Sequence, residues 1–182
     1  MSGEQAQAPR DSESESAHAE REIKTGADAV VRALENAGVE HAFGVQGGAI
    51  MPVYDALYRS EMKHVTMAHE QGAVHAADAY GVVTGEPGIC MATSGPGATN
   101  LVTGIADANM DSDPVVALTG QVPTDVVGND VFQETDTVGI TSPVTKSNAF
   151  ADDPDSVGKD VSTAFAIAKH GRQGPTLVDL PK

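Results

Sequence analysis

One stretch, Gly88-Ile89-Cys90-Met91-Ala92-Thr93-Ser94-Gly95-Pro96-Gly97-Ala98-Thr99-Asn100, decides the fold class of this chain. Its first part, 88–93, is a continuous run without charges, which is typical of a strand covered on both faces. The turn 94–97 follows, and a helix of small residues is predicted to extend to about Met110. A buried strand that leads through a tight turn into a helix is the repeating unit of an α/β sheet.

The same alternation continues on both sides of this stretch. Thr25 is a predicted N-cap, and Gly38 is a natural stop for the helix between them. The other predicted helices cover 50–59, 70–83 and about 154–169, and the located strands cover 41–45, 63–68, 88–93, 114–118 and 176–180. This pattern predicts an α/β fold with a parallel sheet of about six strands and helices on both faces.

Ligands of such sheets bind at the carboxyl ends of the strands. Four segments are predicted to lie there: Gln46-Gly47-Gly48, His69-Glu70-Gln71, the turn 94–97, and the polar, glycine-punctuated loop 120–136. The length and polarity of that loop indicate a functional role.

Charge and composition exclude several classes of protein. The 182 residues include 11 Lys+Arg and 26 Asp+Glu, a formal net charge of −15, which argues against nucleic-acid binding. Residues 1–22 carry −4 of this charge and lack large aliphatic residues after Met1, so we expect a disordered acidic tail before a domain at 23–182. The remaining acids are dispersed, which favours a surface adapted to high salt over a site for a positively charged partner.

Cys90 is the single cysteine, so no disulfide can form within the chain, and we interpret it as a buried small hydrophobe. No apolar run approaches the roughly 20 residues of a membrane span, and the N-terminus lacks a signal core. We therefore expect a soluble cytoplasmic protein, with neither nucleic acid nor membrane as a partner. His69 and His75 are six residues apart, a spacing that does not place them on one helical face for a shared metal, and no metal site is predicted.

Two of the four segments each allow two interpretations. Glu70, at the start of a helix, is either a capping acid near the helix dipole or a functional carboxyl in a dry cleft. The segment 94–100 is either a tight turn or a loop that brings helix N–H groups close to an anion or polar ring. Asn100 stands where a dinucleotide-binding fingerprint has its third glycine, so that fingerprint is incomplete.

Read in order, six motifs resemble one family. They are Phe43-Gly44 with Gly47-Gly48-Ala49-Ile50-Met51-Pro52-Val53-Tyr54-Asp55-Ala56-Leu57, His69-Glu70-Gln71-Gly72-Ala73, Thr93 through Leu101, Thr119-Gly120-Gln121-Val122-Pro123, Phe132-Gln133-Glu134 and Gly174-Pro175-Thr176-Leu177-Val178-Asp179-Leu180-Pro181-Lys182. Over residues 23–182 the chain resembles the N-terminal, pyrimidine-binding domain of acetolactate synthase (acetohydroxyacid synthase) catalytic subunits.

The resemblance implies thiamine diphosphate as cofactor and 2-ketoacids, pyruvate and 2-oxobutyrate, as substrates that are condensed with decarboxylation. It makes Glu70 the catalytic glutamate that bonds N1′ of the aminopyrimidine and favours the imino tautomer, which then deprotonates the thiazolium carbon. The cofactor-binding set implied is Gly47, Gly48, Glu70, Ser94, Gly95, Pro96, Gly97 and Asn100. The substrate-pocket set implied is Ala49, Pro123, Phe132, Gln133 and Lys146, the last being the one base expected near the rim.

Two departures from the family limit the expected activity. Val45-Gln46 replaces the usual Tyr-Pro before the paired glycines, and no Gly-Asp-Gly with a downstream Asn occurs. The domains that the family uses for Mg²⁺-diphosphate and for FAD are therefore expected to be absent. The chain is then a fragment, which we favour, one subunit of a split enzyme, or a remnant. We expect it to be inactive alone and to need a homo-oligomer or a diphosphate-binding partner. The alternatives are one chain of a split thiamine diphosphate-dependent ketoacid decarboxylase, and a non-catalytic nucleotide-binding module.

Overall fold

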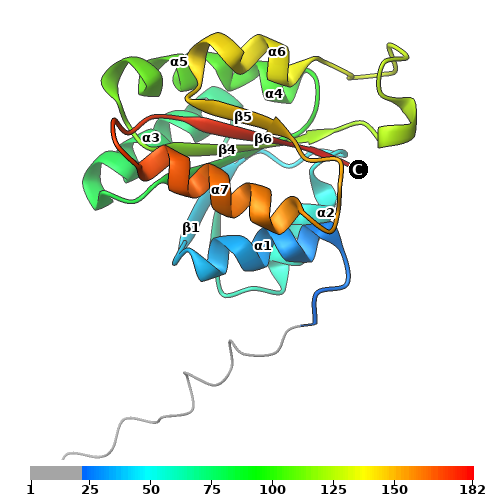
Figure 1. Cartoon of the computed structure of the whole chain (residues 1–182), viewed down its shortest axis with the longest axis horizontal. Coiled ribbons are helices and arrows are strands. Elements are labelled where there is room, and N and C mark those ends of the chain that lie inside the picture. The colour runs from blue at the N-terminus through cyan, green and yellow to red at the C-terminus, as the bar shows by residue number, and fades with distance from the viewer. Residues whose placement is uncertain (1–21) are drawn as a thin grey trace, which may run out of the picture.

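The computed structural model describes residues 22–182; the tail predicted at 1–22 lies almost entirely outside the described residues. Six parallel strands form one sheet in the order β2-β1-β3-β4-β6-β5 (Figure 1). The strands are β1 (His41–Gly44), β2 (Lys63–Thr66), β3 (Gly88–Ala92), β4 (Val115–Gln121), β5 (Ser147–Phe150) and β6 (Thr176–Pro181). The predicted fold class is confirmed, and the short edge strand β5 is the one that the sequence did not locate.

Helices cover both faces of the sheet (Figure 1). The α-helices are α1 (Gly26–Asn36), α2 (Met51–Tyr58), α3 (Glu70–Thr84), α4 (Pro96–Asn100), α5 (Val102–Asp111), α6 (Thr137–Thr141) and α7 (Val157–Lys169), and the two short 3-10 turns are η1 (Thr124–Val126) and η2 (Ser142–Val144). Thr25 caps α1 in a reciprocal capping box with Asp28, and Gly38 adopts φ +79°, as the sequence predicts. Among the described helices, none is long and apolar enough to cross a membrane.

The core has two layers, one on each side of the sheet. In β3, Ile89 and Met91 face the layer under α1, α2 and α7, whereas Cys90 and Ala92 face the layer under α3 and α5. This alternation follows from the two-residue period of a strand. Cys90 is fully buried, as expected of a small hydrophobe, and burial raises the pKa of its thiol to about 12.

The strand order changes direction between β1 and β3. The chain leaves β1 toward β2 at one edge, then returns to the other side of β1 with β3 before continuing through β4 to β6. Parallel sheets bind ligands at such a change of direction, outside the carboxyl ends of the strands. The loops that follow β1 and β3 therefore lie at the position where a site is expected.

Candidate functional site

Glu70 is the first residue of α3, at the carboxyl side of β2. His69 is the N-cap of that helix, and its Nδ1 accepts the N–H of Gln71 at 3.1 Å. The capping role is thus filled by the neighbouring histidine. The Glu70 carboxyl instead turns toward α4, where its Oε2 accepts a hydrogen bond from Nδ2 of Asn100 at 2.9 Å. Among the described residues no group donates to Oε1 of Glu70.

Asn100 is the last residue of α4, thirty positions from Glu70 in the chain. The sequence names it among the cofactor-binding residues but gives no sign of this contact. An amide that donates to one carboxylate oxygen fixes the plane of the carboxyl group while leaving the second oxygen for another partner. Asn100 therefore orients Glu70.

The loops after β1 and β3 pack closely on each other through Thr93. The Oγ1 of Thr93 accepts the backbone N–H of Ala49 at 3.2 Å. A Cβ on Gly47 would lie 2.4 Å from Cβ of Thr93, so only glycine fits there. Gly48 is different, since a Cβ on it would have nothing within 4 Å. Thr93 is a contact residue that the sequence analysis did not single out, because nothing in its neighbourhood predicts its partner in the β1 loop.

The turn after β3 brings a third loop into the site. Gly95 has φ +57°, which glycine adopts without strain, and it begins α4 as the N-cap. A Cβ on Gly95 would lie 2.7 Å from the carbonyl oxygen of Gln133. The backbone at Gln133 thus lies directly against the glycine turn. The remaining predicted residues of the turn follow: Ser94 and Gly97 are buried and Pro96 is exposed.

Phe132 and Gln133 lie on the outside of this chain. The Phe132 side chain is 87% exposed, and Gln133 is exposed with φ 62°. Glu134 closes the loop behind them, because its carboxylate accepts the backbone N–H groups of Gly128 and Val131. These hydrogen bonds, the one from Gly128 first, lower the pKa of Glu134. The loop therefore presents Phe132 to whatever lies beyond the chain and does not form a closed pocket within it.

Pro123 and Lys146 do not join the residues around Glu70. Pro123 is exposed and follows β4, so it lies at the carboxyl ends of the strands, as Glu70 does. Lys146 precedes β5, so it lies at the opposite end of the strands, where their amino ends meet. Its Nζ donates to the carbonyl oxygens of Ile167 and His170 at the end of α7, and desolvation lowers the pKa of Lys146. The expectation that Lys146 supplies a base near the rim is therefore wrong for this chain.

A cavity of about 420 Å³ lies away from Glu70. It is bounded by α1, α2, α7 and the end of β6, and Ala49 is the one predicted site residue in its lining. Glu70, the paired glycines and the turn at Gly95 do not line this cavity.

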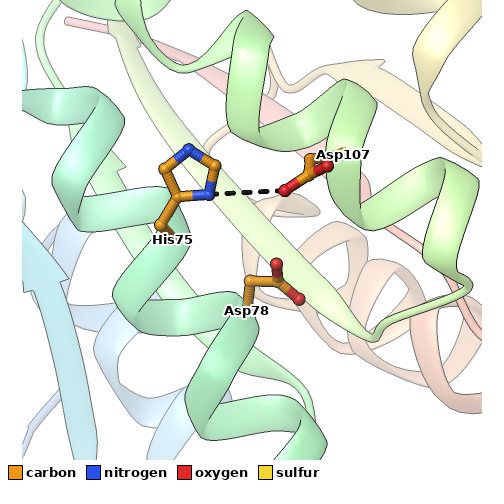
Figure 2. Close-up of side chains that lie close together, drawn as sticks. All are labelled: His75, Asp78 and Asp107. Atoms are coloured by element: carbon orange, nitrogen blue, oxygen red, sulfur yellow. Dashed lines mark ion pairs between the residues drawn. The ribbon is translucent and has the colours of Figure 1, made fainter.

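A second cluster of polar side chains joins α3 to α5 beyond Glu70. Figure 2 shows His75 and Asp78 on α3 and Asp107 on α5, and their ligand atoms lie within 4.8 Å of one another. His75 Nδ1 is 3.7 Å from Oδ2 of Asp107, and these side chains are 40% and 57% exposed. Burial and the neighbouring Asp113 raise the pKa of Asp78 to about 6. His75 is thus half exposed and paired with a carboxylate.

A buried carboxyl that sequence reasoning did not identify lies on β6. Asp179 is 1% exposed, and its oxygens accept hydrogen bonds from Thr119 at 2.7 Å and from Gln121 at 3.0 Å. Burial raises the pKa of Asp179 to about 6, although hydrogen bonds from Thr119, Gln121 and Thr137 act against this.

Comparisons with known proteins identify the family of this chain. Residues 24–140 match the model of the thiamine pyrophosphate enzyme, N-terminal TPP binding domain. The chain is 54% identical over 157 residues to the "Probable acetolactate synthase large subunit" of Methanocaldococcus jannaschii, covering 86% of this chain and 27% of that protein. It is 56% identical over 162 residues to the "Acetolactate synthase large subunit" of Corynebacterium glutamicum, covering 88% and 26%.

A third relative, the "Acetolactate synthase" of Mycobacterium bovis, is 57% identical over 159 residues, covering 87% of this chain and 26% of that protein. The chain thus spans about a quarter of the length of the curated relatives it matches. The family model and these identities extend over most of the described sheet. The chain therefore belongs to the thiamine pyrophosphate enzymes, and it carries their N-terminal TPP-binding domain.

Proposed function

We propose that this chain is the pyrimidine-binding part of an acetolactate synthase, an enzyme that condenses two 2-ketoacids with loss of carbon dioxide. The observation that carries the proposal is the Glu70 carboxyl, oriented by Asn100 at 2.9 Å and next to Gly97 in the turn after β3. The names of the relatives support this choice of reaction. Pyruvate and 2-oxobutyrate are the substrates we expect.

The residues around Glu70 fit the pyrimidine ring of thiamine diphosphate. Oε1 of Glu70 has no donor among the described residues, so it is available to a ring nitrogen. Gly48 leaves open space where a side chain would stand, and the missing Cβ of Gly97 would be 3.6 Å from Oε1 of Glu70. These two positions leave room for a flat ring beside one polar anchor.

When bound, thiamine diphosphate supplies a carbon nucleophile that attacks the ketoacid carbonyl. The residues of this chain contribute at the aminopyrimidine ring of the cofactor. Glu70 would hold a proton at N1′ of the aminopyrimidine, and Asn100 would keep the carboxyl plane in position for that bond. The loop with Gly47 and Gly48 would lie beside the same ring, and the loop with Gln133 would border the second ketoacid.

The diphosphate group requires charge that these residues do not provide. The net charge of the chain is −15, and Lys146 is engaged with the end of α7. We infer that Mg²⁺ and FAD are held by parts of the enzyme outside these residues, and that the active unit is a homo-oligomer or a complex with a diphosphate-binding domain. The chain alone is then expected to form no measurable acetolactate.

A chimera tests the reaction class. Residues 23–182 replace the matching segment of the Corynebacterium glutamicum large subunit, to which the chain is 56% identical. Purified chimera with pyruvate, thiamine diphosphate, Mg²⁺ and FAD is expected to form acetolactate. Release of carbon dioxide with free aldehyde would instead support the ketoacid decarboxylase. Activity that survives Glu70→Gln would support a non-catalytic module.

We also propose that the protein works in a salt-rich cytoplasm. The dispersed acids make a strongly hydrated, self-repelling surface, and screening by salt reduces that repulsion. The free energy of unfolding, measured by thermal or denaturant melts, is expected to rise from dilute buffer to molar KCl. Equal stability in both buffers would contradict this adaptation.

A further inference from the structure

A buried polar network connects the centre of the sheet to the loop that carries Gln133. Asp179 lies opposite Thr119 in the register of β6 and β4. Its Oδ1 accepts the Thr119 hydroxyl at 2.7 Å, and its Oδ2 accepts Nε2 of Gln121 at 3.0 Å. A carboxyl in the core is costly unless its oxygens are hydrogen-bonded, and here both are.

The side-chain amide of Gln121 continues the network to the loop. Its Nε2 also donates to the carbonyl oxygen of Thr135 at 2.7 Å, and its Oε1 accepts the N–H of Val122 at 2.9 Å. Both amide hydrogens and the amide oxygen therefore have partners. Because Val122 begins the loop and Thr135 stands near its end, one side chain holds both ends of the segment 122–136.

Apolar packing contributes little to holding this loop. A cavity of about 340 Å³ separates part of it from the sheet, lined by Asp179, Gln121 and Thr135 together with Val127, Glu134 and Phe150. Val127 and Phe132 are 41% and 87% exposed. Hydrogen bonds must then hold the loop in position over the sheet, and those to the Asp179 carboxyl contribute most.

The middle of the loop contacts the glycine turn of the site. The carbonyl of Gln133 lies against Gly95, which begins the short helix that ends at Asn100. Displacement of the loop therefore moves Gln133 relative to the turn, and it removes the backbone contact at Gly95, where α4 begins.

We propose that Asp179 is a positioning residue, which acts through Gln121 to hold the loop 122–136 against the turn at Gly95. Asparagine keeps the shape of the side chain but removes the charge. Because hydrogen bonds to an ionised acceptor are the stronger kind, Asp179→Asn weakens the hold on Gln121 without opening a cavity. The part of this proposal that concerns the ketoacid rests on the proposed function; the part that concerns the loop does not.

Hydrogen exchange of the chain, followed by mass spectrometry, tests the loop directly. Loss of one hydrogen bond to a charged group corresponds to about 10- to 100-fold faster exchange in peptides from 122–136. Peptides from α3 are expected to exchange as in the parent. Asp152 is an exposed acid outside the network, so Asp152→Asn is expected to leave exchange unchanged in both the loop and α3. Gln121→Met is expected to release the same loop, and the double variant no more than either single one.

The proposal is overturned if folded Asp179→Asn protects residues 122–136 as the parent does, or if exchange rises equally in α3. In the chimera, Asp179→Asn is expected to raise the KM for the ketoacid about tenfold with thiamine diphosphate affinity unchanged. A purely structural role would raise this KM and weaken the affinity for thiamine diphosphate together. If the loop is released but the parent chimera forms no acetolactate, the proposed function fails while the positioning role stands.

Discussion

Two carboxyl groups of this domain have opposite surroundings. Asp179 lies in the middle of the sheet, 1% exposed, with hydrogen bonds to both oxygens. Glu70 lies half-buried at the start of α3 and has one described partner, Asn100, on one oxygen. A carboxyl whose partners are complete holds the fold in place, whereas one with an oxygen left over can bind something else. The difference separates a positioning group from a candidate catalytic one.

The largest effect on stability is expected from titration of Asp179. Its pKa in the folded chain is raised to about 6, above its ordinary value of 3.8, so the folded state holds this proton more tightly than the unfolded state. The stability that this proton confers is complete below pH 4 and is lost as the pH rises through 6, by about 3 kcal/mol in all.

Urea melts of the parent and of Asp179→Asn between pH 4 and 7, in constant high salt, measure this difference. The parent is expected to lose more stability with rising pH than the variant does. Asp78, with a pKa near 6, acts in the same direction in both proteins and so cancels in the comparison. Parallel pH profiles would show that Asp179 is not the buried titrating group.

The paired glycines supply a matched comparison next to Glu70. Gly47→Ala places a Cβ 2.4 Å from Cβ of Thr93, and this overpacking is expected to cost about 2 kcal/mol. Gly48→Ala meets nothing within 4 Å. Thermal melts are expected to show a Tm lower by about 5 °C for the first variant and little change for the second. Equal losses in the two variants would mean that Thr93 does not hold the β1 loop.

Removal of the Asn100 amide tests the orientation of Glu70. Asn100→Ala deletes one hydrogen bond to a carboxylate, worth about 1.5 kcal/mol, so the kcat of the chimera is expected to fall about tenfold. Circular dichroism should show an unchanged fold, and Thr99→Ala, at the exposed neighbouring position, serves as the control. A normal kcat would mean that Glu70 needs no orientation by α4.

The smallest effect is expected at the His75 cluster. The side chains of His75 and Asp107 are 40% and 57% exposed, and exposed ion pairs contribute little. His75→Gln should change the free energy of unfolding by less than about 0.5 kcal/mol, as judged from urea melts. A loss of several times this size would show that the cluster, rather than apolar packing, holds α3 to α5.

The sequence predicts most of the fold because its strands are buried runs with clear stops. The run 88–93 and the helix stop at Gly38 are local signals, and the structure bears them out. The strand β5 escapes prediction because Ser147–Phe150 is short, lies at the sheet edge and has no apolar run. Its place in the sheet comes from pairing with β6, which no local pattern specifies.

The site is predictable in its parts but not in its contacts. Glu70 and the glycine turns follow from their positions after strands and from the resemblance to the family. The bond from Asn100 to Glu70 and the network from Asp179 to Thr135 join residues far apart in the chain, so only the packed sheet brings them together. The sequence misplaces Lys146 because it does not reveal strand β5, which follows this residue. Without β5, the end of the sheet at which Lys146 lies cannot be predicted.

The most direct test of the account is acetolactate formation by the chimera with Glu70→Gln. The parent chimera is expected to convert pyruvate to acetolactate, and the variant to lose about 10²- to 10⁴-fold of that activity, because glutamine cannot hold the proton at the ring nitrogen. Glu61→Gln, an exposed acid before β2, should retain full activity. Activity of Glu70→Gln equal to that of the parent would contradict the assignment of Glu70 as the functional carboxyl.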